Sequence, residues 1–406
     1  MEFQTFTLPN GIRLIHEETG SEVAHCAFFV NAGSRDEKNT ESGLAHFTEH
    51  LLFKGTSSRK AFHILSRMED VGGEINAYTT KEETCIHTSF LKMYYERALE
   101  LIADIVFRSS FADKAIHSEK EVIIEEINSY KDTPLESIFD EFEELVFNGH
   151  PLAGNILGTK KSIRKFKRQD ILSFINTNYN TDQIVISSAG NIGFTKLCSL
   201  VSKHFGEHPE NTRQFNRLKF TPVGISNNKI ALKTHQAHCI IGSHAYGLKN
   251  KKRIGLSLLS NLLGGSGMTA RLNMVLRENK GWAYNVESSY TPYTETGIFS
   301  IYFGTDKINL DKSLAATYKE LRKLCDSPLG TMQLHRAKRQ LIGQMAISSE
   351  SDESRMMSYG KSFLVYNKVD SLQTVFKKIE EVSSVELMDI TNEILNPNNL
   401  SSLIYT

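Results

Sequence analysis

The chain has 406 residues, which favours two domains of roughly 200 residues each over a single core. Lysine plus arginine and aspartate plus glutamate both number 47, so the formal charge is zero and neither nucleic acid nor an anionic membrane is indicated as a partner. No apolar run approaches the roughly 18 residues of a membrane span, no signal peptide is visible, and five scattered cysteines argue against disulfides. We therefore expect a cytoplasmic protein.

Five residues near the start, His46-Phe-Thr-Glu49-His50, form the motif H-x-x-E-H. Two histidines four residues apart lie one above the other on a helix, as a divalent metal requires of its first two ligands. Glu49 points into the same space and could take a proton from a metal-bound water. The motif is the reversed form of the H-E-x-x-H zinc-protease signature. It predicts a metal-dependent hydrolase.

A third metal ligand is expected from the acidic helix predicted at residues 115–130. Glu119 and Glu126 are seven residues apart and share one face of that helix. Glu125 lies about 100° around the helix from Glu126, so the two cannot coordinate one metal in the same way. Periodicity alone does not choose among these glutamates, and a solvated surface is the ordinary interpretation of each.

The polar segment 207–217 is the predicted linker between two domains. The ranges expected are 1–206 for an N-terminal zinc-binding catalytic domain and 218–406 for a C-terminal substrate-binding domain that lacks the metal motif. Similar signals recur in both halves in the same order, which suggests a duplicated unit. Alternating strands mixed with long amphipathic helices indicate an α+β fold. We expect two similar domains, each a mostly antiparallel sheet covered by helices on one face.

Several ordered segments resemble the pitrilysin/insulinase (inverzincin) family of zinc metallopeptidases, especially its short two-domain processing-peptidase branch. The strongest is GLAHFTEHLLFKGTSSR, and the others run along the whole chain: NGIRL, AGSRDE, GGEINAYT, LGGSGMTARL and GTDKI. In that family the third ligand is a glutamate about 76 residues past the second histidine, with a further functional glutamate seven residues earlier. Glu126 and Glu119 occupy these positions, counted from His50.

The resemblance implies one zinc ion per chain, held by His46, His50 and Glu126. It implies that Glu49 is the general base of peptide hydrolysis and that Glu119 orients a ligand histidine. The expected activity is that of a zinc metalloendopeptidase that cleaves extended peptides or unfolded segments inside a clamshell cavity.

Two further groups of residues resemble the substrate-binding parts of the family. An edge strand beside the zinc would bind the peptide by adding it as another strand. Arg277 and Tyr284 resemble an Arg-x6-Tyr pair that contacts substrate carbonyls and stabilises the oxyanion. The residues of the expected edge strand are Asn76, Ala77, Tyr78 and Thr79.

In this family the zinc half and the Arg/Tyr half of one site come from different two-domain units. This chain carries both halves, so we expect a homodimer whose active sites are completed in trans. The alternative is a catalytically dependent or non-enzymatic subunit of a processing-peptidase-like complex, although such subunits typically lose the motif. Apart from the partner subunit, a peptide substrate is the expected partner.

Overall fold

The computed structural model describes residues 3–232 and 234–406. The chain forms two compact units, and each is assembled from three segments of the sequence. The first unit comprises Met1–Asn128, Gly154–Arg217 and Ser348–Val369; the second comprises Ser129–Ala153, Leu218–Ile347 and Asp370–Thr406. The domains expected from sequence were the contiguous ranges 1–206 and 218–406. The units differ from them because residues 129–153 belong to the second unit and residues 348–369 belong to the first.

The first unit is built on a six-stranded sheet in the order β1-β2-β6-β3-β5-β4. The pair β2–β6 is parallel and all other neighbours are antiparallel. Strand β4 therefore forms one edge, and among the described residues it pairs with β5 alone. The strands are β1 (Phe3–Thr7), β2 (Arg13–Glu18), β3 (Val23–Val30), β4 (Glu74–Thr79), β5 (Thr84–Leu91) and β6 (Ile184–Gly190).

Side chains alternate between the two faces of this sheet, as a strand's period of two requires. On β3, Cys26 and Phe28 face the main core, whereas Ala27 and Phe29 face the opposite side. Among the described residues, seven helices contribute buried side chains to the main core. They are α1 (Leu44–Leu52), α2 (Ala61–Glu69), α3 (Tyr95–Phe107), α4 (Asp113–Lys131), α6 (Lys160–Lys165), α7 (Arg168–Asn178) and α8 (Phe194–Phe205).

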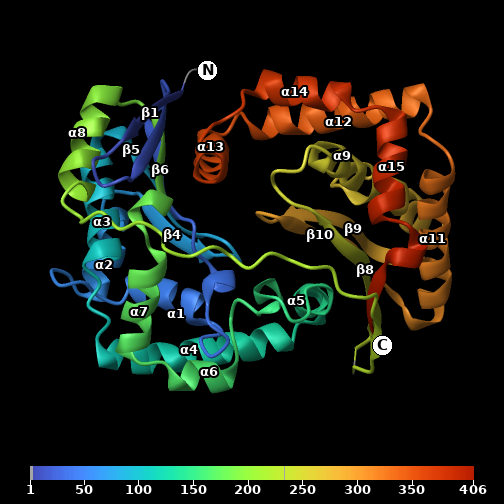
Figure 1. Ribbon diagram of the computed structural model, residues 1–406, viewed down its shortest axis with the longest axis horizontal. Coiled ribbons are helices and arrows are strands. Elements are labelled where there is room, and N and C mark those ends of the chain that lie inside the picture. Colours follow the sequence, from blue (N-terminus) through green and yellow to red (C-terminus); the bar gives the residue numbers. More distant parts are fainter. Residues whose placement is uncertain (1–2, 233) are drawn as a thin grey trace. The chain divides into compact units, whose positions relative to one another are not determined.

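The opposite face of the first sheet is covered by α13 (Asp352–Tyr366), a helix from the C-terminal half of the sequence. Met356 and Phe363 of this helix are buried against Phe29, and the hydroxyl of Ser187 on β6 donates to the carbonyl of Met356 at 2.6 Å. Figure 1 shows α13 in orange-red beside the blue and green strands of this unit. Glycine at position 360 permits the close approach, because a Cβ there would lie 2.2 Å from the ring of Phe29.

The second unit contains a five-stranded sheet in the order β7-β11-β8-β10-β9. The pair β7–β11 is parallel and the other neighbours are antiparallel. Strand β9 forms the edge next to β10, in the place that β4 has next to β5. The strands are β7 (Asn227–Ile230), β8 (Gln236–Tyr246), β9 (Ala283–Pro292), β10 (Thr296–Asp306) and β11 (Ser401–Tyr405).

Most helices of the second unit also pack on one face of its sheet. They are α9 (Arg253–Gly264), α10 (Arg271–Asn273), α11 (Leu310–Asp326), α12 (Thr331–Ser348), α14 (Leu372–Glu381) and α15 (Ser384–Ile394). The other face is covered by α5 (Pro134–Val146), a helix from the N-terminal half of the sequence. Its Ile138 and Phe142 are fully buried against Tyr302 and Leu403.

The expected fold class is confirmed. Both units have a largely antiparallel sheet and most helices on one face. Their strand orders correspond over five strands, and β1 of the first unit is an additional edge strand. Helix α1 follows β3 in the first unit as α9 follows β8 in the second. The sequence patterns did not reveal that a helix from the other half of the chain covers the second face of each sheet.

Candidate metal site

The motif residues lie on α1, which is packed firmly into the first unit. Phe47 and Leu51 are buried in the main core, whereas His46, Glu49 and His50 share another face of the helix. His46 and Glu49 are each only 9% exposed. The packed face thus fixes the helix and leaves the motif face to form a site.

Helix α4 brings a carboxylate to the two histidines. Nε2 of His46 lies 3.9 Å from Oε1 of Glu126, and Nε2 of His50 lies 3.7 Å from Oε2 of Glu126. Donor atoms of these three residues all lie within 4.8 Å of one another, and the described residues contain no other such group of three or more. Glu125, by contrast, is exposed and accepts a hydrogen bond from Asn128 of its own helix.

The three donor groups fit a zinc ion. Zinc–ligand distances of about 2.0–2.1 Å in a tetrahedral arrangement place neighbouring donor atoms about 3.3 Å apart. The two measured separations from Glu126 exceed this by only about half an ångström. Two imidazoles and one carboxylate are also a donor set that catalytic zinc sites use, with a fourth position left for water.

The ionisation of the two histidines differs. Burial and the neighbouring His50 lower the pKa of His46 to about 3, so its ring is neutral and able to bind a metal. Burial also acts to lower the pKa of His50. The hydrogen bond with Glu119 and the nearby carboxylates of Glu49 and Glu126 outweigh the effect of burial, so the pKa of His50 is raised.

Glu119 lies on α4 and contacts His50 from the side away from the metal position. Its Oε1 is 2.9 Å from Nδ1 of His50, and its Oε2 is 2.8 Å from Nζ of Lys54. The side chain is only 3% exposed. Such a carboxylate fixes the ring orientation of a ligand histidine and leaves Nε2 for the metal. Lys54 lies two residues beyond the end of α1 and was not among the site residues predicted from sequence, because helical spacing does not apply there.

Glu49 lies on α1, and its side chain contacts the edge strand β4. Its Oε2 accepts a hydrogen bond of 3.2 Å from the hydroxyl of Thr79, the last residue of β4. Burial raises the pKa of Glu49, which suits a carboxylate that must take up and release a proton. This contact was not foreseen from sequence, because it depends on how the sheet edge packs beside the helix.

The expected substrate-binding residues Asn76, Ala77, Tyr78 and Thr79 all lie on β4. The side of β4 away from β5 has no ladder partner among the described residues. An unpaired strand edge of this kind offers backbone N–H and C=O groups to an extended peptide.

Arg277 and Tyr284 belong to the second unit. Arg277 lies in a π-helical turn, Met274–Glu278, and its side chain is 52% exposed. Tyr284 lies on the edge strand β9, is 58% exposed, and its hydroxyl donates to Asp306 at 3.3 Å. Both are polar and exposed enough to contact a ligand.

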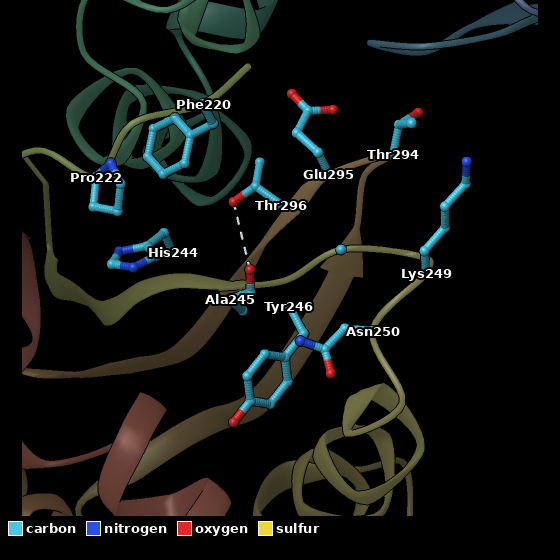
Figure 2. Close-up of a pocket in the computed structure, with 11 residues that line it drawn as sticks. Phe220, Pro222, His244, Ala245, Tyr246, Lys249, Asn250, Thr294, Glu295 and Thr296 are labelled. Atoms are coloured by element: carbon cyan, nitrogen blue, oxygen red, sulfur yellow. Dashed lines mark hydrogen bonds between the residues drawn. The ribbon is translucent and has the colours of Figure 1, made fainter.

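The second unit also contains a pocket of about 260 Å³ at the end of β8 (Figure 2). Phe220 and Pro222 line one side, and His244, Lys249 and Glu295 lie around the remainder. None of the residues expected to function in catalysis lines it.

A membrane-spanning helix is absent from the described residues, because none of their helices has the required length and apolar character.

Comparisons with known proteins identify two domains of one family. Residues 13–160 match the insulinase domain of peptidase family M16, and residues 165–341 match the domain described as "Peptidase M16 inactive domain". The chain is 30% identical over 403 residues to the uncharacterized zinc protease YmxG of Bacillus subtilis, covering 98% of this chain and 97% of that protein. It is 31% identical over 396 residues to an uncharacterized zinc protease of Mycobacterium leprae, covering 96% and 88%.

The fold is shared with two crystal structures. A protease from Helicobacter pylori superposes with a TM-score of 0.91 at 20% identity, over 100% of this chain and 99% of that one. A structure from Pseudomonas fluorescens, described as a peptidase M16 inactive domain, gives 0.93 at 19% identity, over 100% and 98%. The names of the sequence relatives support a zinc peptidase-like function. With both family domains present in order and relatives matched over nearly their full length, the chain belongs to the insulinase family of peptidases, M16.

Proposed function

We propose that this protein is a zinc-dependent endopeptidase that hydrolyses peptide bonds in extended peptides or unfolded segments. The observation that carries the proposal is the placement of His46, His50 and Glu126 around one point, with the buried carboxylate of Glu49 beside them. The unpaired edge of β4, joined to Glu49 through Thr79, supports a peptide substrate.

His46, His50 and Glu126 would hold one zinc ion per chain. When bound, the ion supplies a Lewis acid that makes a water more acidic and polarises the peptide carbonyl. Glu49 accepts the proton of the attacking water and delivers it to the nitrogen of the leaving amine. Glu119 keeps His50 in one orientation through the 2.9 Å hydrogen bond to Nδ1.

Strand β4 would hold the substrate by backbone hydrogen bonds, so binding would depend on an extended conformation more than on side-chain identity. Arg277 and Tyr284 of the partner subunit would contact substrate carbonyls and stabilise the oxyanion. This assignment makes the active enzyme a homodimer with sites completed in trans, each enclosed in a clamshell cavity.

The replacement Glu49→Gln tests the proposal. It preserves shape and leaves all three proposed metal ligands in place, so the purified variant should bind zinc as the wild type does. Loss of the general base should lower kcat by about 10²- to 10⁴-fold. Zinc content is measured by atomic spectrometry, and hydrolysis is measured by mass spectrometry on a mixed peptide library.

The exposed Glu125→Gln is the matched control and should retain full activity. Hydrolysis by a zinc-loaded Glu49→Gln protein at the wild-type rate would refute the role of Glu49. A zinc-loaded wild-type dimer that cleaves nothing in the library would instead favour the partner-dependent subunit.

A further inference from the structure

Arg217 is the last residue of the segment Gly154–Arg217, after which the chain enters the second unit at Leu218. Its side chain is largely buried in the first unit. Its guanidinium holds both oxygens of Asp36, with Nε–Oδ1 at 2.8 Å and Nη2–Oδ2 at 2.7 Å. Nη2 also donates to the carbonyl of Glu82 at 2.9 Å. The side chain of Arg217 is 10% exposed and that of Asp36 is fully buried. One side chain thus joins two loops that are distant in sequence.

The first of these loops leads into α1, which is called the metal helix below because it carries His46 and His50. Glu37, the neighbour of Asp36, accepts hydrogen bonds from the backbone N–H groups of Gly43 at 2.9 Å and Ala45 at 2.7 Å. These groups belong to the first turn of α1, where the N-cap Gly43 has no side chain of its own to accept them. Glu37 therefore sets the start of α1 at Leu44, two residues before His46.

The second loop is the turn of residues 80–83, which connects β4 to β5. Arg217 reaches its backbone at Glu82, and Arg35 pairs with the carboxylate of the same residue. The turn is also bonded to the loop before α1, because the N–H of Arg35 donates to the carbonyl of Lys81 at 2.8 Å. Thr79, immediately before this turn, donates to Glu49. The turn therefore sets where the edge strand lies relative to the metal helix.

From this geometry we infer that Arg217 is a positioning residue for the active site, an assignment that rests on the proposed peptidase function. It fixes the position of the loop before α1 relative to the turn that follows β4, the strand proposed to bind the substrate. The C-terminal end of the segment 207–217, expected from its polar composition to be a linker, is in this respect a docked part of the first unit. Arg213 of the same segment supports this, since it also donates to the carbonyl of Asn31.

The test compares Arg217→Gln with a matched variant, Arg355→Gln. Arg355 is also a buried arginine of the first unit with two carboxylate partners, Glu17 at 2.8 Å and Asp352 at 2.6 Å. In the part of the chain that the structure describes, its side chain bonds to Glu17, Ser349 and Asp352, and to neither the loop before α1 nor the turn after β4. Both full-length variants are assayed zinc-loaded with a quenched-fluorescent peptide, and their stabilities are compared by urea unfolding.

Arg217→Gln should raise KM by about tenfold or more, since the edge strand loses its fixed place, and should weaken zinc binding several-fold. Arg217→Lys keeps the charge but not the bidentate geometry, so its KM should fall between those of wild type and Arg217→Gln. It also keeps the inference testable where the glutamine variant does not fold. Arg355→Gln should leave KM and zinc affinity within about twofold of wild type. Equal KM values in the glutamine variants at equal stability would overturn the inference.

A second readout separates this inference from the proposed function. Amide hydrogen exchange should quicken at residues 44–50 and 74–83 in the Arg217 variants and remain unchanged there in Arg355→Gln. If the zinc-loaded wild type cleaves no peptide, the proposed function fails while the exchange pattern still decides whether Arg217 positions these elements. Unchanged exchange at both segments in the Arg217 variants would reject the positioning role whatever the activity.

Discussion

Nδ1 of His50 lies 2.9 Å from Oε1 of Glu119, and this contact determines which ring nitrogen of His50 faces Glu126. Burial opposes ionisation of Glu119. The hydrogen bonds from His50 and Lys54 outweigh it and hold the pKa of Glu119 below its usual value. The carboxylate is therefore ionised and can accept the imidazole proton, which aims Nε2 at the proposed metal position.

Replacing Glu119 by glutamine should weaken zinc binding by about 10- to 100-fold, because the amide no longer fixes His50 through a charged hydrogen bond. Competition with a chelator of known zinc affinity measures this change. Glu121→Gln, an exposed position two residues along the same helix, should leave zinc affinity unchanged. Equal affinities for the two variants would contradict an orienting role for Glu119.

Asp104 on α3 anchors the loop that follows the metal helix. Its carboxylate accepts hydrogen bonds from the hydroxyls of Thr56 and Ser58, both at 2.8 Å, and from Arg59 at 2.7 Å. Asp104→Asn should lower the free energy of unfolding by about 1.5–3 kcal/mol at pH 7, because the neutral amide loses the charged hydrogen bond between the buried Asp104 and Arg59. Arg59 keeps Glu100 as its second carboxylate partner at 2.8 Å. Urea unfolding measures the difference. Asp70→Asn, at a side chain that is 65% exposed, should change stability by less than about 0.5 kcal/mol.

The difference in the free energy of unfolding between wild type and Asp104→Asn should depend on pH. Burial opposes ionisation of Asp104, but hydrogen bonds from Arg59, Ser58 and Thr56 prevail and lower its pKa. The stabilisation is therefore fully present above the unfolded-state pKa of about 3.9 and is lost as the pH falls through the lower folded-state pKa. The stability gap between wild type and Asp104→Asn should stay constant above about pH 5 and narrow below pH 4. A gap that widens on acidification would reverse the assigned sign.

Two helical glycines should respond in opposite ways to alanine. A Cβ at Gly360 would lie 2.2 Å from Cε2 of the buried Phe29 ring, so Gly360→Ala should destabilise the protein by about 1–3 kcal/mol. A Cβ at Gly343, within α12, would meet nothing within 4 Å. Gly343→Ala should therefore stabilise by up to about 1 kcal/mol through helix propensity. Thermal or urea unfolding checks both signs, and stabilisation by Gly360→Ala would show that α13 does not pack so closely on the sheet.

Local periodicity is sufficient to predict which residues of α1 and of α4 share a helix face. The four-residue spacing of His46 and His50 and the seven-residue spacing of Glu119 and Glu126 each define one helix face, whatever lies opposite. The choice between Glu125 and Glu126 is different in kind, since it depends on how α4 is rotated against α1, which no pattern within α4 encodes. Only the family resemblance pointed to Glu126 before the fold was known.

The exchange of helices between the units was not predictable by the same reasoning. The amphipathic pattern of α13 indicates that one face is buried, but not which sheet covers it. The answer depends on contacts between Met356 or Phe363 and residues more than 150 positions away in sequence. The contacts of Arg217 with Asp36 and Glu82 are equally non-local, which is why a polar segment was expected to be only a linker.

Mixing two inactive variants should restore activity if the sites form in trans. Glu49→Gln damages only the first unit, and Tyr284→Phe changes only an exposed hydroxyl of the second. In a mixed dimer, one site would combine the intact Glu49 of one subunit with Tyr284 of the partner subunit. Random subunit exchange makes half of the dimers mixed, each with one intact site of two, so activity should reach about a quarter of the wild-type value.

The control mixes Glu49→Gln with His50→Gln. Both changes lie in the first unit, so every possible site stays damaged and no activity should return. Analytical ultracentrifugation of the same samples establishes whether dimers are present. Sites completed within one chain would give no recovery in either mixture, because each variant would carry its own lesion into its own site. A monomer with full activity would exclude the trans arrangement outright, since the partner's Tyr284 could then contribute nothing to catalysis.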